Sequence, residues 1–506
     1  MPRGLMRARL LRCGMGLFLL AAALTAANVL LLPFARACYG YGAGPAFASF
    51  ALALGAFLLL GRALARADEG RLERAVRTAL PAFLAALFAL QLLLGYLMAY
   101  TPSWDNHMLV DGARLLASGA GFADGPDYAL YFSRFSNQWG FLLILTGLFR
   151  LFAAAGVTDF LFGLVVLQAA LYTLGLLAAA DIARRLRGAR GVLALLALLA
   201  ACLPLYLAAA VLYTDTFSLP FILLTLRFAL CAQQAKAARA RVGYALAAAM
   251  TAACGAQIKM TVLIALLAAG IVWTLRLRAR EALCCCALSV AAAVSLAALT
   301  QGVMTARVLD GRAVFQHRVP AVHWVMMSIP SQSNPYGSYY GEDYLETWTL
   351  MRKGASREEI RASIYSRMRD KLYALRDPRR FALAALAKNA GAMGDGTFGM
   401  TEMLDDGPVR ENAVSSFVLE GRPFYGLYSA VCSGIYLAAL TLAAAGCAGD
   451  IRRRDERAAV LYVAALGIML FLMLWEARSR YLFGFVPVVL LLGAGGIARE
   501  NKDIKI

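Results

Sequence analysis

The feature that most constrains this chain is a series of apolar runs, each about as long as a bilayer is thick. Hydrophobic residues make up 61% of the 506-residue sequence and charged residues 16%, whereas a soluble domain carries roughly 25% charged residues. About 20 apolar residues span the hydrocarbon core as a helix. The runs therefore predict one all-α integral membrane body with about 12–13 transmembrane helices, near residues 13–35, 45–61, 79–100, 138–154, 159–183, 191–212, 216–232, 243–256, 260–275, 282–301, 425–446, 458–475 and 481–498.

Basic clusters between these runs predict which loops face the cytoplasm. The 50 Lys and Arg exceed the 31 Asp and Glu, for a net charge of +19, and retention of Lys and Arg in cytoplasmic loops accounts for such an excess. The clusters lie at 62–77, 236–241, 276–280 and 452–457, which places the N-terminus inside. The loop 101–137 is then outside, and it is acidic, with Asp105, Asp111, Asp124 and Asp127. Because no basic stretch is interleaved with aromatic residues, we expect no nucleic acid partner.

One basic cluster conflicts with this topology. If 138–154 and 159–183 both cross the membrane, the cluster Arg184, Arg185, Arg187 and Arg190 lies outside, against the bias. Either one of the two segments is only partly inserted, or this loop departs from the rule.

The runs divide the chain into four parts. We expect an N-terminal transmembrane hairpin at 1–78, whose first apolar run we interpret as an uncleaved helix, a catalytic module at 79–301, an external loop region at 302–424 and C-terminal helices at 425–506. In the loop region, Ser356 and Glu359 form a capping-box pattern that predicts an amphipathic helix, which ends before Asp377-Pro378. The ten cysteines include no CxxC pair, which argues against a disulfide framework or a zinc site.

The external loop after 79–100 carries the first candidate site residues. Asp105 follows directly on the end of a span, where a carboxylate is partly desolvated and favoured as a base. The alternative is that Asp105 caps an interfacial helix. His107 and Asp111 follow on the same stretch, as substrate contacts or as interfacial surface.

Isolated polar residues next to later spans give further candidates. Arg134 and Asn137 lie among aromatic residues just before a span, where an arginine binds phosphate bidentately or snorkels to the interface. Asp215 and Lys259 interrupt spans, and charges at membrane depth indicate function by default, against a structural ion pair.

The last candidates lie near the C-terminus and in the long loop. Glu476, Arg478, Arg480 and Tyr481 join two spans on the external side, as ligands of an anionic headgroup or as an interfacial anchor. His323 is a candidate substrate contact in the long external loop.

In this order and sidedness, the elements resemble the GT-C superfamily of polytopic glycosyltransferases, in particular bacterial relatives of the protein O-mannosyltransferases and of the aminoarabinose lipid A transferases (glycosyltransferase family 39-like). The resemblance rests on Trp104-Asp105, Arg134 with Asn137, Tyr213-Thr-Asp215, Ile258-Lys259, His323 and Glu476-x-Arg478-x-Arg480-Tyr481, and it covers most of 79–498. Asp105 is followed by Asn106, whereas many relatives have a second carboxylate there, so the resemblance implies no definite cofactor and leaves a divalent metal as the alternative.

The resemblance implies a polyprenyl-phosphate sugar as donor and inversion at the anomeric carbon. The acceptor is then a cell-envelope glycan, lipid or protein on the external face of a bacterial plasma membrane. Asp105 is the expected base, and Arg134, Lys259, Arg478 and Arg480 are the expected phosphate ligands, because a phosphate leaving group needs cations more than a protonating acid. The alternative is a polytopic transporter or flippase of lipid-linked saccharides. Transporters place such charges near the midplane between repeated halves, and no repeat is evident.

Overall fold

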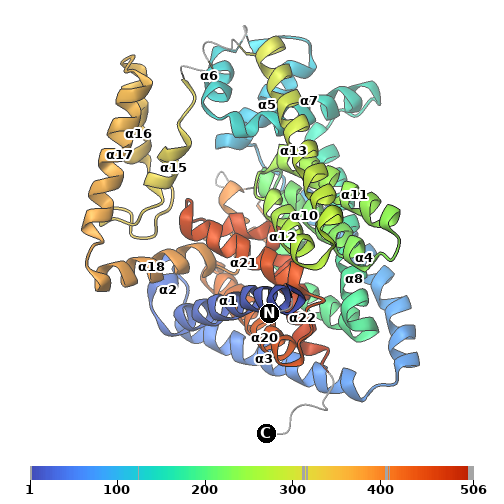
Figure 1. Ribbon diagram of the computed structural model, residues 1–506. Helices are drawn as coiled ribbons and strands as arrows, with labels where there is room; N and C mark the ends of the chain where they lie inside the picture. The colour runs from blue at the N-terminus through green and yellow to red at the C-terminus, as the bar shows by residue number, and fades with distance from the viewer. Residues whose placement is uncertain are drawn as a thin grey trace.

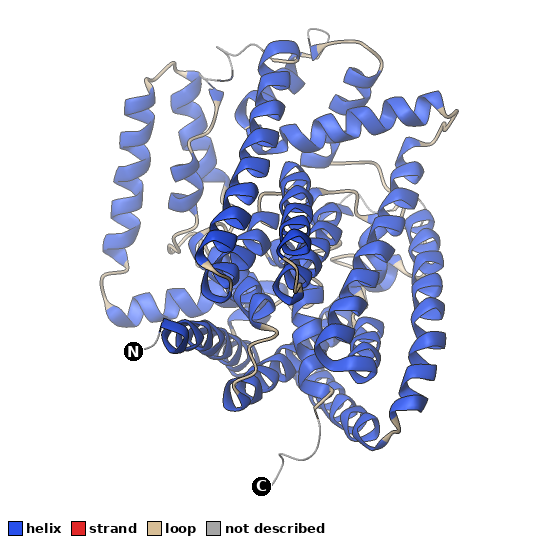
Figure 2. Cartoon of the chain, turned by 45° about the vertical axis from the view of Figure 1, so that its right-hand side comes forward, coloured by secondary structure: helices blue, strands red, loops and turns tan. Residues whose placement is uncertain are grey.

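The structure, a computed structural model, describes residues 3–122, 125–309, 314, 317–404, 408–409 and 411–499, so Asp124 lies outside it. Every regular element in these ranges is a helix (Figure 2), which confirms the all-α fold. The helices are α1 (Arg3–Leu31), α2 (Phe34–Tyr39), α3 (Ala43–Arg66), α4 (Glu69–Leu97), α5 (Trp104–Ala117), α6 (Pro126–Arg134), η2 (Ser136–Gln138), α7 (Trp139–Ala154), α8 (Phe160–Ala201), α9 (Pro204–Leu207), η3 (Ala208–Ala210), α10 (Thr214–Gln234), α11 (Ala238–Ile258), α12 (Val262–Arg276), α13 (Ala279–Arg307), α15 (Ala321–Met327), α16 (Gly341–Arg352), α17 (Arg357–Ala374), α18 (Pro378–Met393), η4 (Glu402–Leu404), α19 (Ser415–Val418), α20 (Tyr425–Arg453), α21 (Ala459–Leu474), η5 (Ser479–Phe485) and α22 (Val486–Ile497).

Most of the long helices have the length and composition of membrane spans. Among the described residues, nine helical segments are long and apolar enough to cross a membrane, and α12 and α21 are shorter apolar helices. Large apolar side chains on the outer helices face outward, for example Leu52 on α3 and Leu283 on α13, which are 76% and 71% exposed. Exposed apolar surface of this extent is expected where lipid replaces water as the solvent.

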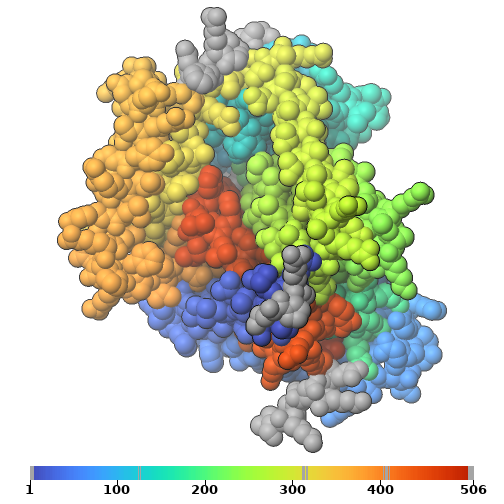
Figure 3. All heavy atoms as spheres, viewed as in Figure 1, coloured from blue at the N-terminus to red at the C-terminus, as the bar shows by residue number. Residues whose placement is uncertain are grey.

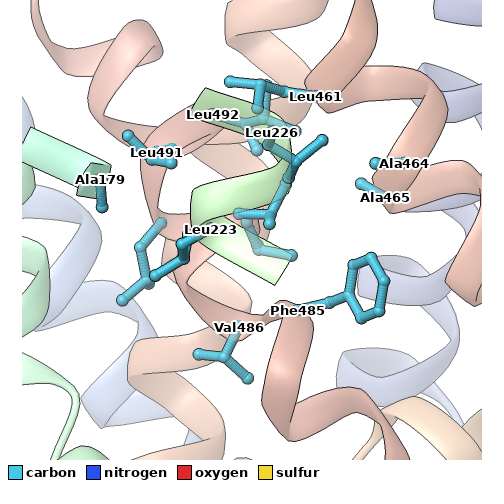
Figure 4. Packing of buried hydrophobic residues seen from close by; sticks show 14 of the residues in the cluster. Ala179, Leu223, Leu226, Leu461, Ala464, Ala465, Phe485, Val486, Leu491 and Leu492 are labelled. Atoms are coloured by element: carbon cyan, nitrogen blue, oxygen red, sulfur yellow. The ribbon is translucent and has the colours of Figure 1, made fainter. Parts of the chain in front are cut away.

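The centre of the bundle is built around α10. Its side chains are mostly buried, and Leu223 and Leu226 lie among residues of α8, α21 and α22 (Figure 4). Phe485 and Val486 close the same cluster where η5 passes into α22. This packing holds the middle of α10 and the end of η5, so the polar residues at the start of each element follow directly from an anchored segment.

Ion pairs gather the basic clusters at one end of the bundle. Arg184 pairs with Glu73 at the start of α4, and Arg190 Nε lies 3.9 Å from Glu69. Arg187 pairs with Asp450 at the end of α20. The cluster 184–190 therefore lies at the same end as 62–77 and 452–457, in agreement with the charge bias, and we call this the basic end.

The contacts of α7 bear on the conflict over this cluster. The indole Nε1 of Trp139 at the start of α7 donates to the carbonyl of Phe132 at 2.7 Å, and Arg150 near its end donates to the carbonyl of Leu116 at 2.8 Å. Both ends of α7 thus contact the segment 104–134, and α8 alone runs from there to the basic end. The segment Ser136–Ala154, which contains α7, is long and apolar enough to cross a membrane, but these contacts favour the first alternative, incomplete insertion of one segment.

The helix boundaries near residue 190 also differ from the prediction. The runs 159–183 and 191–212 form one continuous element, α8, with a kink at Gly188, whose φ of 63° is left-handed and suits glycine. The second run ends as a helix at Ala201, before Pro204, and continues only as short turns. Its predicted end at 212 is therefore wrong, because apolar character continues beyond the point where the proline stops the helix.

The segment α15–α17 stands to one side of the bundle (Figure 1). The predicted capping box is confirmed: Ser356 Oγ accepts from the Glu359 amide, and the Glu359 carboxylate accepts from the Ser356 amide. Ile360 and Ile364 on α17 are buried against Met326 of α15. The apolar face of the predicted helix thus packs within this segment.

Candidate functional site

The carboxylate of Asp105 is held by two tyrosines. It lies in the first turn of α5, and its Oδ1 accepts from the Tyr131 hydroxyl at 2.6 Å while Oδ2 accepts from the Tyr213 hydroxyl at 2.9 Å. The preceding residue, Trp104, has a left-handed φ of 48°, which is uncommon for a bulky residue and tends to occur at functional sites. The Asp105 carboxylate is therefore fixed in direction by contacts from α6 and from the start of α10.

The two tyrosines stay protonated beside this carboxylate. Burial, and then the Asp105 carboxylate, raise the pKa of Tyr131 well above its usual value. The Tyr213 hydroxyl also accepts from Gln138 Nε2 at 3.2 Å. Gln138 was not singled out from the sequence, although it follows Asn137, and Tyr213 entered only as part of the Tyr213-Thr-Asp215 pattern, without a role of its own.

A second polar group lies where α10 begins and where α11 breaks into α12. Lys259 occupies this break and pairs with Asp215 in the first turn of α10. Its Nζ also lies 4.2 Å from the centre of the Tyr481 ring, a cation–π contact. Arg480 Nε is 4.0 Å from Asp215 Oδ2. The break predicted from Lys259 is thus a real interruption that places an ammonium group in a buried polar cluster.

The turn before η5 adds Glu476 and Arg478 to this cluster, η5 adds Arg480, and η4 adds Glu402. Arg478 lies 3.7 Å from Glu402 Oε1 and 4.0 Å from Glu476 Oε1, and Arg480 lies 4.0 Å from Glu402 Oε2. Burial raises the pKa of both glutamates, with the two arginines acting in the opposite direction. We call Asp215, Lys259, Glu402, Glu476, Arg478, Arg480 and Tyr481 the arginine–carboxylate cluster.

Tyr213 joins Asp105 to this cluster. The Arg480 guanidinium carbon lies 5.7 Å from the centre of the Tyr213 ring, whose hydroxyl donates to Asp105. The half-exposed Tyr339 lies in the fields of Asp105, Glu476 and Arg478, and burial is the main cause that raises its pKa. The structure therefore brings Asp105 together with the predicted site residues Asp215, Lys259, Glu476, Arg478, Arg480 and Tyr481.

Arg134 and His323 lie in a neighbouring aromatic group. The Arg134 guanidinium carbon is 3.2 Å from the centre of the Trp348 ring. His323 is fully buried, and its Nδ1 is 3.0 Å from Thr347 Oγ1. This group meets the Asp105 site through the Tyr131–Phe135 ring contact at 4.8 Å. The guanidinium of Arg134 is thus stacked on α16 and is not brought among the residues of the arginine–carboxylate cluster.

Three further predicted residues lie on the surface. His107 Nδ1 is 2.7 Å from Asp111 Oδ2, and Asp111 also pairs with Arg114 at 3.0 Å, all on the half-exposed side of α5. Asn137 is exposed, whereas its neighbour Gln138 is buried. The structure does not bring His107, Asp111 or Asn137 into contact with the Asp105 site.

A buried aspartate that the sequence did not single out holds the arginine turn. Asp395 is 2% exposed, and its Oδ1 accepts from the amide and hydroxyl of Thr397 at 2.8 and 2.6 Å. Its Oδ2 accepts from the Gly399 amide at 2.9 Å and from the Ser479 hydroxyl at 2.8 Å. Since Ser479 lies between Arg478 and Arg480, Asp395 fixes both the loop 395–402 and the turn that carries the arginines.

The residues present do not fit a divalent metal. Both Asp105 oxygens accept hydrogen bonds from tyrosines, and Asn106 donates to Tyr100. Across the described part of the chain, no group of three or more His, Cys, Asp or Glu side chains is arranged to hold a metal ion. The chemistry below is therefore routed through side chains alone.

Comparisons with known proteins give one family and two related structures. A family model described as a conserved hypothetical integral membrane protein matches residues 46–499. Two crystal structures of ArnT from Cupriavidus metallidurans are similar to the chain. The form bound to undecaprenyl phosphate is 15% identical with a TM-score of 0.34, over 83% of this chain and 77% of that one. The apo form is 17% identical with a TM-score of 0.35, over 84% and 78%. No curated protein matches. A likeness at this level does not assign an activity.

Proposed function

The chain belongs to this family of conserved hypothetical integral membrane proteins, and we propose that it is a membrane glycosyltransferase. It transfers a sugar from a polyprenyl-phosphate donor to a cell-envelope glycan, lipid or protein. The reaction takes place on the external face of a bacterial plasma membrane and inverts the anomeric configuration.

The observation that carries this proposal is the position of Tyr213. Its hydroxyl donates to Asp105 at 2.9 Å, and its ring lies 5.7 Å from the guanidinium carbon of Arg480. A carboxylate base and a group of cations thus share one site, although they come from α5, α10, the α11–α12 break and the turn before η5. Transfer from a phosphate carrier requires this pairing of a base with phosphate ligands.

Asp105 is the residue that takes the proton in this reaction. The acceptor hydroxyl lies against the carboxylate, and its proton passes to an Asp105 oxygen as its oxygen attacks the anomeric carbon of the sugar. The hydroxyls of Tyr131 and Tyr213 hold the carboxylate in place and remain donors, because the pKa of Tyr131 is raised. A single base is sufficient because the leaving group needs no proton.

The cations receive the leaving phosphate. As the new glycosidic bond forms, the bond between the anomeric carbon and the phosphate oxygen breaks, and its electron pair stays on the phosphate. Arg478 is the most exposed cation of the cluster, at 35%, and its nearest cluster carboxylate oxygen is 3.7 Å away. A guanidinium in this position donates two parallel hydrogen bonds to a phosphate.

The surroundings of the site suit a lipid-borne donor. The basic clusters at 62–77, 184–190, 236–241, 276–280 and 452–457 lie at the opposite end of the bundle, and this charge bias supports an external position for the site. The space-filling view shows the surface hollowed between the orange segment α16–α17 and the yellow helix α13 (Figure 3). Apolar side chains on α13, such as Val290, Val294 and Leu299, are exposed and supply a surface for a polyprenyl chain.

The test is a comparison of envelope glycans from cells that carry the wild-type protein or Asp105→Asn. We expect the variant to lose one sugar decoration at unchanged expression, because an amide does not accept the proton. Asp127→Asn is the matched control, since Asp127 is an exposed carboxylate in the first turn of α6. An unchanged glycan profile in Asp105→Asn contradicts the assignment of the base.

A further inference from the structure

Glu402 lies between the two arginines of the arginine–carboxylate cluster and faces each with a different oxygen. Oε1 is 3.7 Å from Arg478, and Oε2 is 4.0 Å from Arg480. Both distances exceed those of a hydrogen bond, which for an N–H donor and an oxygen is about 2.7–3.2 Å. The carboxylate therefore balances two positive charges without close contact to either.

The loop that carries Glu402 holds it rigidly in this position. Asp395 accepts from Gly399 in this loop and from Ser479 in the opposing turn, so the two sides are tied together. Gly399 has a left-handed φ of 55°, and a Cβ there would lie 3.0 Å from the Glu402 carboxyl group. The absence of a Cβ at Gly399 thus leaves room for the Glu402 carboxylate between the loop and the turn. The backbone conformation of the loop therefore directs this carboxylate toward the arginines.

Arg478 and Arg480 form an anion-binding site, and the carboxylate of Glu402 already lies in it. A carboxylate and a phosphate both present two oxygens to guanidinium groups, so the two anions can occupy the same position between arginines. Burial raises the pKa of Glu402, so its negative charge is already disfavoured where it stands. A phosphate that reaches Arg478 and Arg480 takes over the role of this carboxylate.

We propose that Glu402 is a built-in counter-anion that occupies the phosphate position between Arg478 and Arg480 and competes with the phosphate of the lipid-linked substrate. This inference rests on the proposed function, in which Arg478 and Arg480 bind the phosphate. It adds that Glu402 competes with the phosphate for these two arginines. The competing carboxylate lowers the affinity of the site for phosphate. It thereby favours release of the polyprenyl phosphate after the sugar has been transferred.

Direct binding to the purified full-length protein in detergent tests the proposal. The probes are undecaprenyl phosphate in mixed micelles and inorganic phosphate, at fixed pH and ionic strength. Glu402→Gln keeps the size of the side chain and removes its charge, so we expect both probes to bind about tenfold more tightly, the factor that corresponds to about 1.4 kcal/mol. Arg478→Gln is expected to weaken binding by a similar factor.

Two further variants complete the design. Glu411→Gln is the matched control, because Glu411 pairs with Arg422 on the surface and is expected to leave both affinities unchanged. Glu402→Asp keeps the charge but withdraws the carboxylate from the arginines, and we expect binding about threefold tighter, since the ion-pair energy falls with distance. This variant tests the proposal independently if the amide variant does not fold.

The outcomes separate this proposal from the proposed function. Unchanged or weaker phosphate binding in Glu402→Gln, together with weaker binding in Arg478→Gln, overturns the counter-anion and leaves the phosphate site in place. Tighter binding of the lipid alone also overturns it, because the effect then does not act on the phosphate. If neither Glu402→Gln nor Arg478→Gln changes binding, the phosphate site itself is wrong, and the proposed function falls with it.

Discussion

Two groups of buried charges lie at opposite ends of the bundle and differ in how closely their charges pair. At the basic end, Asp450 accepts from Arg187 at 2.5 Å and from the Tyr462 hydroxyl at 3.0 Å, and Arg187 also pairs with Asp455 at 3.1 Å. In the arginine–carboxylate cluster, Arg478 and Arg480 keep 3.7–4.0 Å from their carboxylates. The first group is closed by hydrogen bonds. In the second, Lys259 and Asp215 pair closely, whereas Arg478 and Arg480 face Glu402 only at the longer distances.

The difference teaches that residue type alone does not separate a structural ion pair from a binding site. Both groups contain arginines and carboxylates in a membrane protein, and both are expensive to bury. In the closed group, hydrogen bonds compensate this cost within the protein. In the open group, Arg478 is the most exposed cation and faces its carboxylates at 3.7 and 4.0 Å, which is why we place the chemistry there.

The largest expected effect is on stability at the basic end. Asp450→Asn removes the charge that Arg187 and Arg499 both face, and breaking a buried pair costs about 3–5 kcal/mol. Arg478→Gln also removes one charge, but from a partly exposed side chain, and we expect it to lower the free energy of unfolding by less than about 1 kcal/mol. Thermal unfolding of the purified variants in detergent measures both. Equal stability of the two variants contradicts the distinction between a closed and an open group.

The next effect is on activity at the other end. Arg478→Gln is expected to lower donor turnover by roughly 10²–10³-fold, the usual result of removing one donor that stabilises developing charge. Arg422→Gln, in a surface pair with Glu411, is the control and is expected to keep full turnover. Turnover is measured as release of polyprenyl phosphate. A change of less than threefold in Arg478→Gln removes this residue from the mechanism.

His323 extends the comparison to a third buried polar group. Burial, with Arg367 and Lys371 nearby, lowers the pKa of His323 to about 3, from a usual 6.5. As pH falls below 6.5, the unfolded chain takes up a proton that the folded state does not, so stability is full above pH 6.5 and is lost progressively toward pH 3. At pH 5 the loss is about 2 kcal/mol.

The variants His323→Gln and His107→Gln check this expectation. Thermal unfolding at pH 7.5 and pH 5 should show a smaller loss of stability in His323→Gln than in the wild type. His107 lies on the surface of α5, and its variant should keep the pH dependence of the wild type. An unchanged pH dependence in His323→Gln shows that this histidine is not the group that titrates.

The smallest effect concerns the link between base and cations. Tyr213→Phe removes one of the two hydroxyls that hold Asp105, and a hydrogen bond to a charged group contributes about 1.5–3 kcal/mol. We expect turnover to fall about tenfold or more, with donor binding little changed. Tyr128→Phe, on the partly exposed side of α6, is the control. If Tyr213→Phe instead weakens donor binding and leaves the turnover of bound donor unchanged, Tyr213 does not act by holding Asp105.

The fold was predictable where long apolar runs decide it. Each predicted run overlaps a helix, because a bilayer allows little else for such a sequence. The path of α7 was not predictable from its composition, because a run of that length crosses or lies along an end equally well. The sequence signal for this ambiguity was the basic cluster 184–190, which two full crossings by 138–154 and 159–183 would place outside.

The site was predictable only in part, for a similar reason. Asp215 and Lys259 interrupt apolar runs, and their burial cost makes them conspicuous in the sequence. Glu402 and Asp395 lie in a loop without periodicity, so nothing local shows that they face Arg478 and Ser479. The polar island Asp395–Glu402, rich in glycine and threonine, was the one signal available for them.

The most direct measurement is turnover and binding of a panel of undecaprenyl-phosphate sugars by the purified protein in liposomes. The central claim predicts that the wild type releases undecaprenyl phosphate from one of them. Asp105→Asn should bind the same donor within about threefold but turn it over at least about 10²-fold more slowly. Movement of intact donor between leaflets without cleavage, or wild-type turnover by Asp105→Asn, would contradict it.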